Sequence, residues 1–148
     1  MKAMMNIAVG LLMLTACTGQ STRPLPKLNV KDGLAIKGYD VVAYFTEGRP
    51  VKGLPSFSHT WEGATWYFSG ADNLEAFKAG PYRYAPQYGG FCAYGASKGY
   101  LADTDPNAWT IIGEKLYLNY SMKVRTEWLK DTSDRIAAAD KYWNTIIK

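Results

Sequence analysis

Three side chains in this sequence carry atoms that suit binding of a soft metal ion. They are the thiol of Cys92, the imidazole of His59 and the thioether of Met122. Thiolate, imidazole and thioether ligands together favour Cu(I) or Zn(II), and Cu(I) accepts two or three ligands. His59 is the only histidine, so a site with two or three histidines from one chain is excluded. We therefore expect Cys92 to be the leading metal ligand, helped by His59 and Met122.

A structural role for the thiol is the alternative. Cys92 lies in the stretch Tyr88–Tyr94, among two glycines and three aromatic residues. In such a setting a thiol is either a small buried hydrophobe or a ligand or nucleophile held at a pocket. A lone histidine such as His59 can likewise be a residue with satisfied hydrogen bonds and no ligand. The sequence leaves both alternatives open.

Catalytic chemistry has less support. Nucleophilic catalysis by Cys92 and His59 would also need an oxyanion hole and an orienting Asn or Asp, which no motif identifies. Asp103 and Asp105 suggest oxygen ligands for Ca²⁺, but their loop lacks the glycine and the distal glutamate of an EF-hand, so a turn is expected there. We expect a protein that is not an enzyme, with a Cys-dependent enzyme as a distant third hypothesis.

The N-terminus has the pattern of an export signal. Lys2 precedes an apolar run from Ala3 to Leu14, which is shorter than the about 20 residues of a membrane-spanning helix. Leu14-Thr15-Ala16-Cys17 follows and resembles the bacterial lipoprotein signal, which implies cleavage after residue 16 and a lipid on Cys17. We expect a signal peptide over 1–16 and a proline-containing tether over 17–33. An ordinary secretory signal is the alternative.

This N-terminus implies a location in the cell envelope. Thr18 follows Cys17 where an Asp would favour the inner membrane, so a periplasm-facing anchor at the outer membrane is slightly preferred. A lipidated Cys17 leaves Cys92 without a partner in its own chain. If the signal were not processed, a Cys17–Cys92 disulfide would be the rival arrangement. The membrane and a periplasmic protein are the partners we expect.

The charge pattern argues against nucleic acid as a partner. The chain has 17 Lys and Arg against 13 Asp and Glu, a net charge of +4. These basic residues are scattered and form no stripe that could follow a phosphate backbone.

Patterns of apolar residues and turn residues predict an α+β domain over residues 34–148. A small antiparallel sheet built from two hairpins is expected to pack against helices. The sequence features behind this prediction are a β-rich run over 36–45, a hairpin of 57–61 with 64–68, a helix from 71 ended by Gly80-Pro81, a partly helical segment over 81–99, a hairpin of 109–112 with 115–120, a helix through Lys130 with Ser121 as N-cap, and a last helix from Thr132 or Ser133.

Aromatic residues are numerous, with 5 Trp, 11 Tyr and 5 Phe. Core packing is expected for Trp66, Phe68, Trp109 and Trp128. Any aromatic surplus at the surface would form a stacking face for sugars, peptides or a partner.

Several ordered segments resemble the YHS domain. They are Gly38–Phe45, Trp61–Phe68 and Asn73–Phe77. Three later segments resemble the exported, stand-alone YHS-domain proteins of bacteria: Tyr84–Tyr94, Asp105–Trp109 and Leu116–Tyr120. The similarity covers roughly Leu34 to Trp143 and implies a YHS-like core with a C-terminal helical extension.

The resemblance has two implications for metal binding. Small YHS modules of metal-transporting ATPases are thought to bind soft metals through cysteines. The matching positions in this chain are Ala43, Ser69 and Asn73, so this chain lacks the thiolates of that metal site. The exported subgroup keeps the cysteine that matches Cys92 and resembles a family linked to copper or other metals. We therefore expect a transition metal, copper before zinc, at Cys92 with His59 and Met122. The alternative is a non-catalytic interaction module in which Cys92 is structural.

Overall fold

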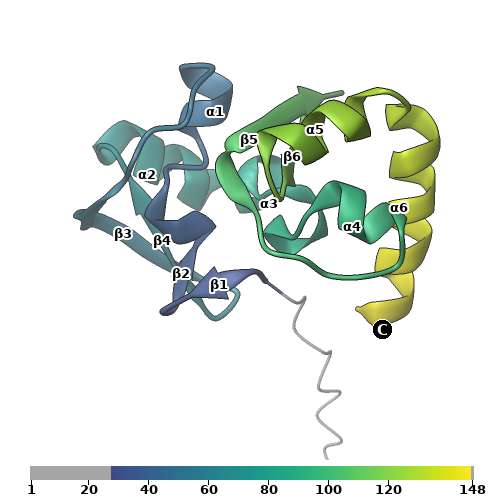
Figure 1. The fold of residues 1–148 in the computed structure, drawn as a ribbon. Coiled ribbons are helices and arrows are strands. Elements are labelled where there is room, and N and C mark those ends of the chain that lie inside the picture. The colour runs from purple at the N-terminus through teal and green to yellow at the C-terminus, as the bar shows by residue number, and fades with distance from the viewer. Residues whose placement is uncertain (1–27, 148) are drawn as a thin grey trace, which may run out of the picture.

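A computed structural model describes residues 28–147 of the chain as an α+β fold (Figure 1). The N-terminal half holds β1 (Val30–Lys31), β2 (Leu34–Ala35), the 3₁₀ helix η1 (Ile36–Gly38), α1 (Ala43–Thr46), β3 (Leu54–Trp61), β4 (Ala64–Phe68), α2 (Ala71–Ala79) and α3 (Pro81–Tyr84). The C-terminal half holds the 3₁₀ helix η2 (Gln87–Gly90), α4 (Ala93–Ser97), β5 (Asp105–Ile112), β6 (Lys115–Asn119), α5 (Met122–Leu129) and α6 (Thr132–Ile146).

Both predicted hairpins are confirmed. In the first, His59 pairs with Trp66, and the two-residue turn has positive φ at Glu62 (51°) and Gly63 (76°). Two positive φ angles match the right-handed twist of the strands, which favours this turn in hairpins. The second hairpin turns at Gly113 and Glu114 in the same way, with φ of 55° and 61°.

The prediction that the two hairpins form one antiparallel sheet is wrong. The first hairpin belongs to a four-stranded sheet of order β1-β2-β4-β3, in which β2 runs parallel to β4, and β5-β6 form a separate sheet. The edge of β4 that faces away from β3 is already taken, because Leu34 pairs with Thr65 and the Thr65 N–H donates to the Gly33 carbonyl. The second hairpin therefore packs through side chains, and Leu116 and Leu118 join the core around Trp66.

The β-rich run expected over residues 36–45 is also wrong. Residues 36–38 form η1, and α1 begins at Ala43. The cause is Asp40, whose buried Oδ1 accepts hydrogen bonds from the N–H groups of Val42 (2.9 Å) and Ala43 (3.2 Å). A carboxylate that bonds to the backbone two and three residues ahead closes the chain into a helical turn.

The helices expected in the second half are confirmed. The Ser121 hydroxyl accepts a hydrogen bond from the Val124 N–H and caps α5, and α6 begins at Thr132, with the side chain of Asp131 as its cap. In the first half, α2 ends before Gly80-Pro81 as expected, but its N-cap is Gly70 without a side-chain hydrogen bond.

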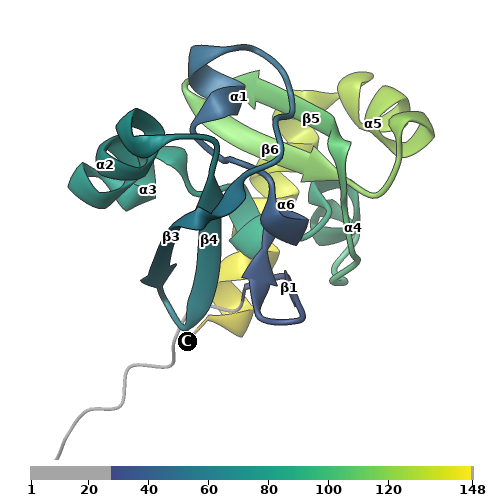
Figure 2. The same cartoon turned by 90° about the vertical axis from the view of Figure 1, so that its left-hand side faces the viewer.

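Two hydrophobic clusters hold the fold together. The larger one joins the first sheet to β6 and includes Trp66, Phe68 and Phe77, and the smaller one packs α4, α5 and α6 around Trp128. Of the four aromatic residues expected in the core, Trp66, Phe68 and Trp128 are buried, and Trp109 is half-buried against the larger cluster. Figure 1 shows the two halves side by side, and Figure 2, seen from the side of the N-terminal half, shows α1 next to the second hairpin.

The N-terminal predictions lie largely outside the described residues. The signal peptide of 1–16, Cys17 and most of the tether belong to residues 1–27. Within the range assigned to the tether, Val30–Lys31 already form β1 and pair with β2, so the fold begins before Leu34. No helix within residues 28–147 has the length and hydropathy of a membrane span.

Candidate functional site

A buried carboxylate lies where the first hairpin meets α1 and α2. Asp40 is fully buried, and its Oδ2 accepts hydrogen bonds from the Ser69 N–H (2.8 Å), the Ser69 hydroxyl (2.7 Å) and the Asn73 amide (2.7 Å). With the two bonds to Oδ1, five donors surround one carboxylate. A buried charge is tolerated when its hydrogen-bonding capacity is filled in this way.

This cluster contains the three positions singled out by the family resemblance. Ser69 and Asn73 lie 26 and 30 residues after Ala43, yet all three donate hydrogen bonds to Asp40, Ala43 through its backbone N–H. None of the three side chains is a soft metal ligand. The cluster is therefore a network of hydrogen bonds centred on a carboxylate.

The thiol of Cys92 is enclosed by backbone groups. Cys92 is 2% exposed and is the N-cap residue of α4, where Sγ accepts a hydrogen bond from the Gly95 N–H (3.5 Å). Sγ also accepts from the Tyr120 N–H (3.3 Å) and donates to Oδ1 of Asn119 (3.5 Å). Two accepted bonds and one donated bond use the hydrogen-bonding groups of a neutral thiol.

The neighbour of this thiol is a buried asparagine. Asn119 Oδ1 accepts from the Tyr94 N–H (3.0 Å) as well as from Cys92, which fixes the orientation of the amide. Its Nδ2 has no hydrogen-bond partner among the residues that the structure describes. Cys92 and Asn119 together tie α4 to the end of β6.

The other two predicted metal ligands have different surroundings. His59 lies half-buried in β3, with its ring 6.3 Å from the ring of Phe77 on α2. Met122 is 49% exposed at the start of α5. No hydrogen bond or ring contact links either residue to Cys92 within residues 28–147. The same part of the chain contains no group of three His, Cys, Asp or Glu side chains arranged to hold a metal ion.

A polar cleft of about 520 Å³ lies between the two halves of the fold. The N-terminal half contributes Lys37, Tyr39 and Lys52, and the C-terminal half contributes residues 103–107 and Tyr120. A hydrogen bond of 2.7 Å from the Tyr44 hydroxyl to the Pro106 carbonyl connects the two walls. Burial, followed by the nearby Tyr39 and two carboxylates, raises the pKa of Tyr44 above its ordinary value, so that this donor stays protonated.

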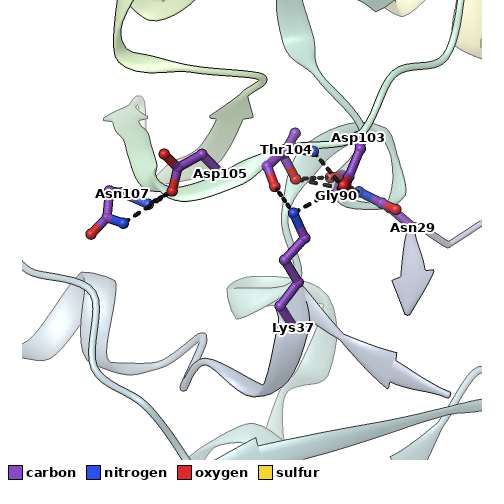
Figure 3. A network of polar contacts seen from close by, with 7 residues as sticks. All are labelled: Asn29, Lys37, Gly90, Asp103, Thr104, Asp105 and Asn107. Atoms are coloured by element: carbon purple, nitrogen blue, oxygen red, sulfur yellow. Dashed lines mark hydrogen bonds and ion pairs between the residues drawn. The ribbon is translucent and has the colours of Figure 1, made fainter. Parts of the chain in front are cut away.

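An ion pair forms part of the lining of the cleft (Figure 3). Lys37 Nζ lies 2.9 Å from Asp103 Oδ2 and donates to the Thr104 carbonyl at 2.6 Å. Asn29 donates to Asp103 Oδ1 at 2.9 Å. Burial alone would raise the pKa of Asp103, but the hydrogen bonds from Asn29, Lys37 and the Thr104 N–H outweigh it and hold that pKa below its ordinary value.

The other charged groups of the cleft have no ion-pair partner within residues 28–147. Lys52 Nζ lies 5.9 Å from the centre of the Tyr39 ring. Asp105 Oδ1 accepts from the N–H (2.9 Å) and the side-chain amide (3.0 Å) of Asn107 (Figure 3). The turn expected in this acidic loop is wrong for these residues, because Asp105 and Asn107 already belong to β5. Lys52, Asp105 and Asn107 can therefore contact a ligand.

Sequence reasoning missed this cleft as a site. Asp103 and Asp105 were considered as Ca²⁺ ligands, Tyr120 belonged to a segment that resembles exported YHS-domain proteins without a role of its own, and Lys37 and Lys52 carried no motif. The one hint in the sequence was its high content of tyrosine. It showed neither where the cleft lies nor which residues line it.

Comparisons with known proteins identify no relative. No protein-family model, no curated protein and no solved structure matches this chain.

Proposed function

We propose that the chain is a lipid-anchored, periplasm-facing binding protein of YHS type that performs no catalysis. Its ligand occupies the cleft between the two halves, and Cys92 has a structural role. The lipid on Cys17 attaches the domain to the membrane, with the outer membrane preferred.

The convergence at Asp40 supports a YHS-like core. The resemblance aligns Ala43, Ser69 and Asn73 with the metal-binding positions of small YHS modules, and such positions must lie close together in any chain with that core. The hydrogen bonds of all three to Asp40 meet this requirement. The carboxylate and its donors replace a bound metal as the centre of the cluster.

The observation that carries the proposal is the contrast between the thiol and the cleft. Cys92 is 2% exposed and its hydrogen bonds are directed to protein groups, so a metal would have to displace them. The cleft is accessible, is built from both halves, and has a volume typical of small-molecule sites. Copper or zinc at Cys92 is the untested alternative, and the cleft is the better supported site.

Four probes of different charge test the proposal. Residues 18–148 include every element described here, so this soluble form is titrated with cellobiose, glutamate, inorganic phosphate and spermidine while backbone amide NMR signals are recorded. We expect one probe to shift the amide signals of Tyr39, Lys52, Asn107 and Tyr120. If neither these probes nor diacetylchitobiose shifts these signals, the cleft is not the binding site and the proposal is wrong.

A further inference from the structure

We infer that the cleft binds a neutral saccharide, an inference that rests on the proposed function and names its ligand class. Three features of the lining lead to it: balanced charge, a mixture of free donors and acceptors, and two tyrosines beside them.

The charges in the cleft oppose ions of either sign. Its lining holds two lysines and two aspartates. Lys37 and Asp103 neutralise each other at 2.9 Å, which leaves one ammonium on Lys52 and one carboxylate on Asp105. An anion attracted by Lys52 is repelled by Asp105, and a cation attracted by Asp105 is repelled by Lys52. An uncharged ligand avoids both penalties.

The polar groups left in the cleft suit hydroxyl groups. Because Asp105 Oδ1 takes both hydrogen bonds from Asn107, the other oxygen of Asp105 and the carbonyl oxygen of the Asn107 amide can accept from a ligand. Lys52 adds a donor that can reach a ligand oxygen. A hydroxyl both donates and accepts, so a ring with several hydroxyls can satisfy all three residues at once.

The apolar part of the cleft suits the carbon face of a sugar ring. Tyr39, Pro106 and Tyr120 line it, and Tyr120 is 61% exposed. A tyrosine offers an apolar ring with a polar tip, which matches a pyranose with its C–H face and its hydroxyl rim. The hydrogen bond from the Tyr120 N–H to Cys92 Sγ fixes the backbone at Tyr120, and therefore the point from which the tyrosine ring extends.

The test compares disaccharides with charged probes in the form comprising residues 18–148. Cellobiose and diacetylchitobiose are added in separate NMR titrations, which distinguish a site for plain hydroxyls from one for acetamido sugars. We expect either sugar to shift the amide signals of Asn107 and Tyr120, with a dissociation constant in the millimolar range, about 1 mM. Glutamate, phosphate and spermidine are expected to leave these signals unchanged.

Matched variants assign the binding to the cleft. Tyr120→Ala removes the ring that packs against the sugar, and Asp105→Asn replaces a charged acceptor with an NH₂ group that cannot accept, so each variant weakens binding about tenfold. Tyr82→Ala is the control, since Tyr82 is 74% exposed and lies outside the cleft, and it leaves the affinity unchanged. Amide spectra of all three variants verify that they are folded before titration.

The results separate this inference from the proposed function. If a charged probe binds in the cleft and neither sugar does, the saccharide inference is wrong while the proposed function stands. If no probe binds in the cleft, both are wrong. Sugar binding that Tyr120→Ala and Asp105→Asn leave unchanged also overturns the inference.

Discussion

The backbone N–H of Tyr120 donates a 3.3 Å hydrogen bond to Sγ of Cys92, 28 residues earlier in the chain. The thiol thus anchors the residue whose exposed side chain lines the cleft. This relationship gives the only cysteine in the described part of the chain a structural role that also serves the candidate binding site.

The first prediction concerns this thiol. Cys92→Ala removes the acceptor of the Tyr120 and Gly95 N–H groups and leaves a small cavity, so we expect the free energy of unfolding to fall by about 1–3 kcal/mol. Urea unfolding followed by tryptophan fluorescence measures this loss. The control is Met122→Ala at an exposed position, with an expected change within about 0.5 kcal/mol. Equal stability of the two variants would contradict a structural role for the thiol.

The second prediction concerns the buried carboxylate. Asp40→Asn places an NH₂ group where several donors converge, so at least one of the bonds from Ser69 and Asn73 is lost. We expect the free energy of unfolding to fall by about 2–4 kcal/mol. Asp32→Asn is the matched control. Asp32 is exposed in a turn, and asparagine tolerates the positive φ angle of this position. A loss below about 0.5 kcal/mol in Asp40→Asn would show that the network contributes little.

The third prediction concerns the ion pair in the lining of the cleft. The pKa of Asp103 is lower in the folded chain than in the unfolded one, so its contribution to stability is present above the unfolded pKa of about 4. This contribution is lost as the pH falls through the folded pKa. Since the side chain of Asp103 is 51% exposed, we expect the contribution to be at most about 1 kcal/mol.

Carboxyl-carbon NMR checks this third prediction directly. The pKa of Asp103 is measured in the wild type and in Lys37→Met, which removes a hydrogen bond and a positive charge from the carboxylate. The pKa is expected to rise in the variant. An unchanged pKa would mean that Lys37 and Asp103 do not interact in solution.

Local patterns predicted much of the fold. The turn at Glu62-Gly63, the cap at Ser121 and the alternation of the hairpin strands act over a few residues, so the sequence displays them directly. The run over 36–45 failed because Asp40 closes a helical turn through Oδ1. Its carboxylate is also bonded to Ser69 and Asn73, about 30 residues away, and a strand propensity carries no information about such partners.

The candidate site was less predictable for the same reason. The sequence left Cys92 as either a buried residue or a metal ligand, because its partners Asn119 and Tyr120 lie at the end of the second hairpin, 27 and 28 residues later. The cleft requires Lys52 and Asn107 from opposite halves of the fold. A single sequence does not show that these residues meet.

Competition for Cu(I) tests the central claim most directly. The form comprising residues 18–148 and its Cys92→Ser variant are titrated side by side against a chromophoric Cu(I) chelator, with His59→Ala as a third sample. We predict that none of the three removes copper from the chelator, because Sγ is buried and bonded to the protein. If the wild type instead binds one Cu(I) tightly and Cys92→Ser does not, the thiol is a metal ligand and its assignment as a structural residue is wrong.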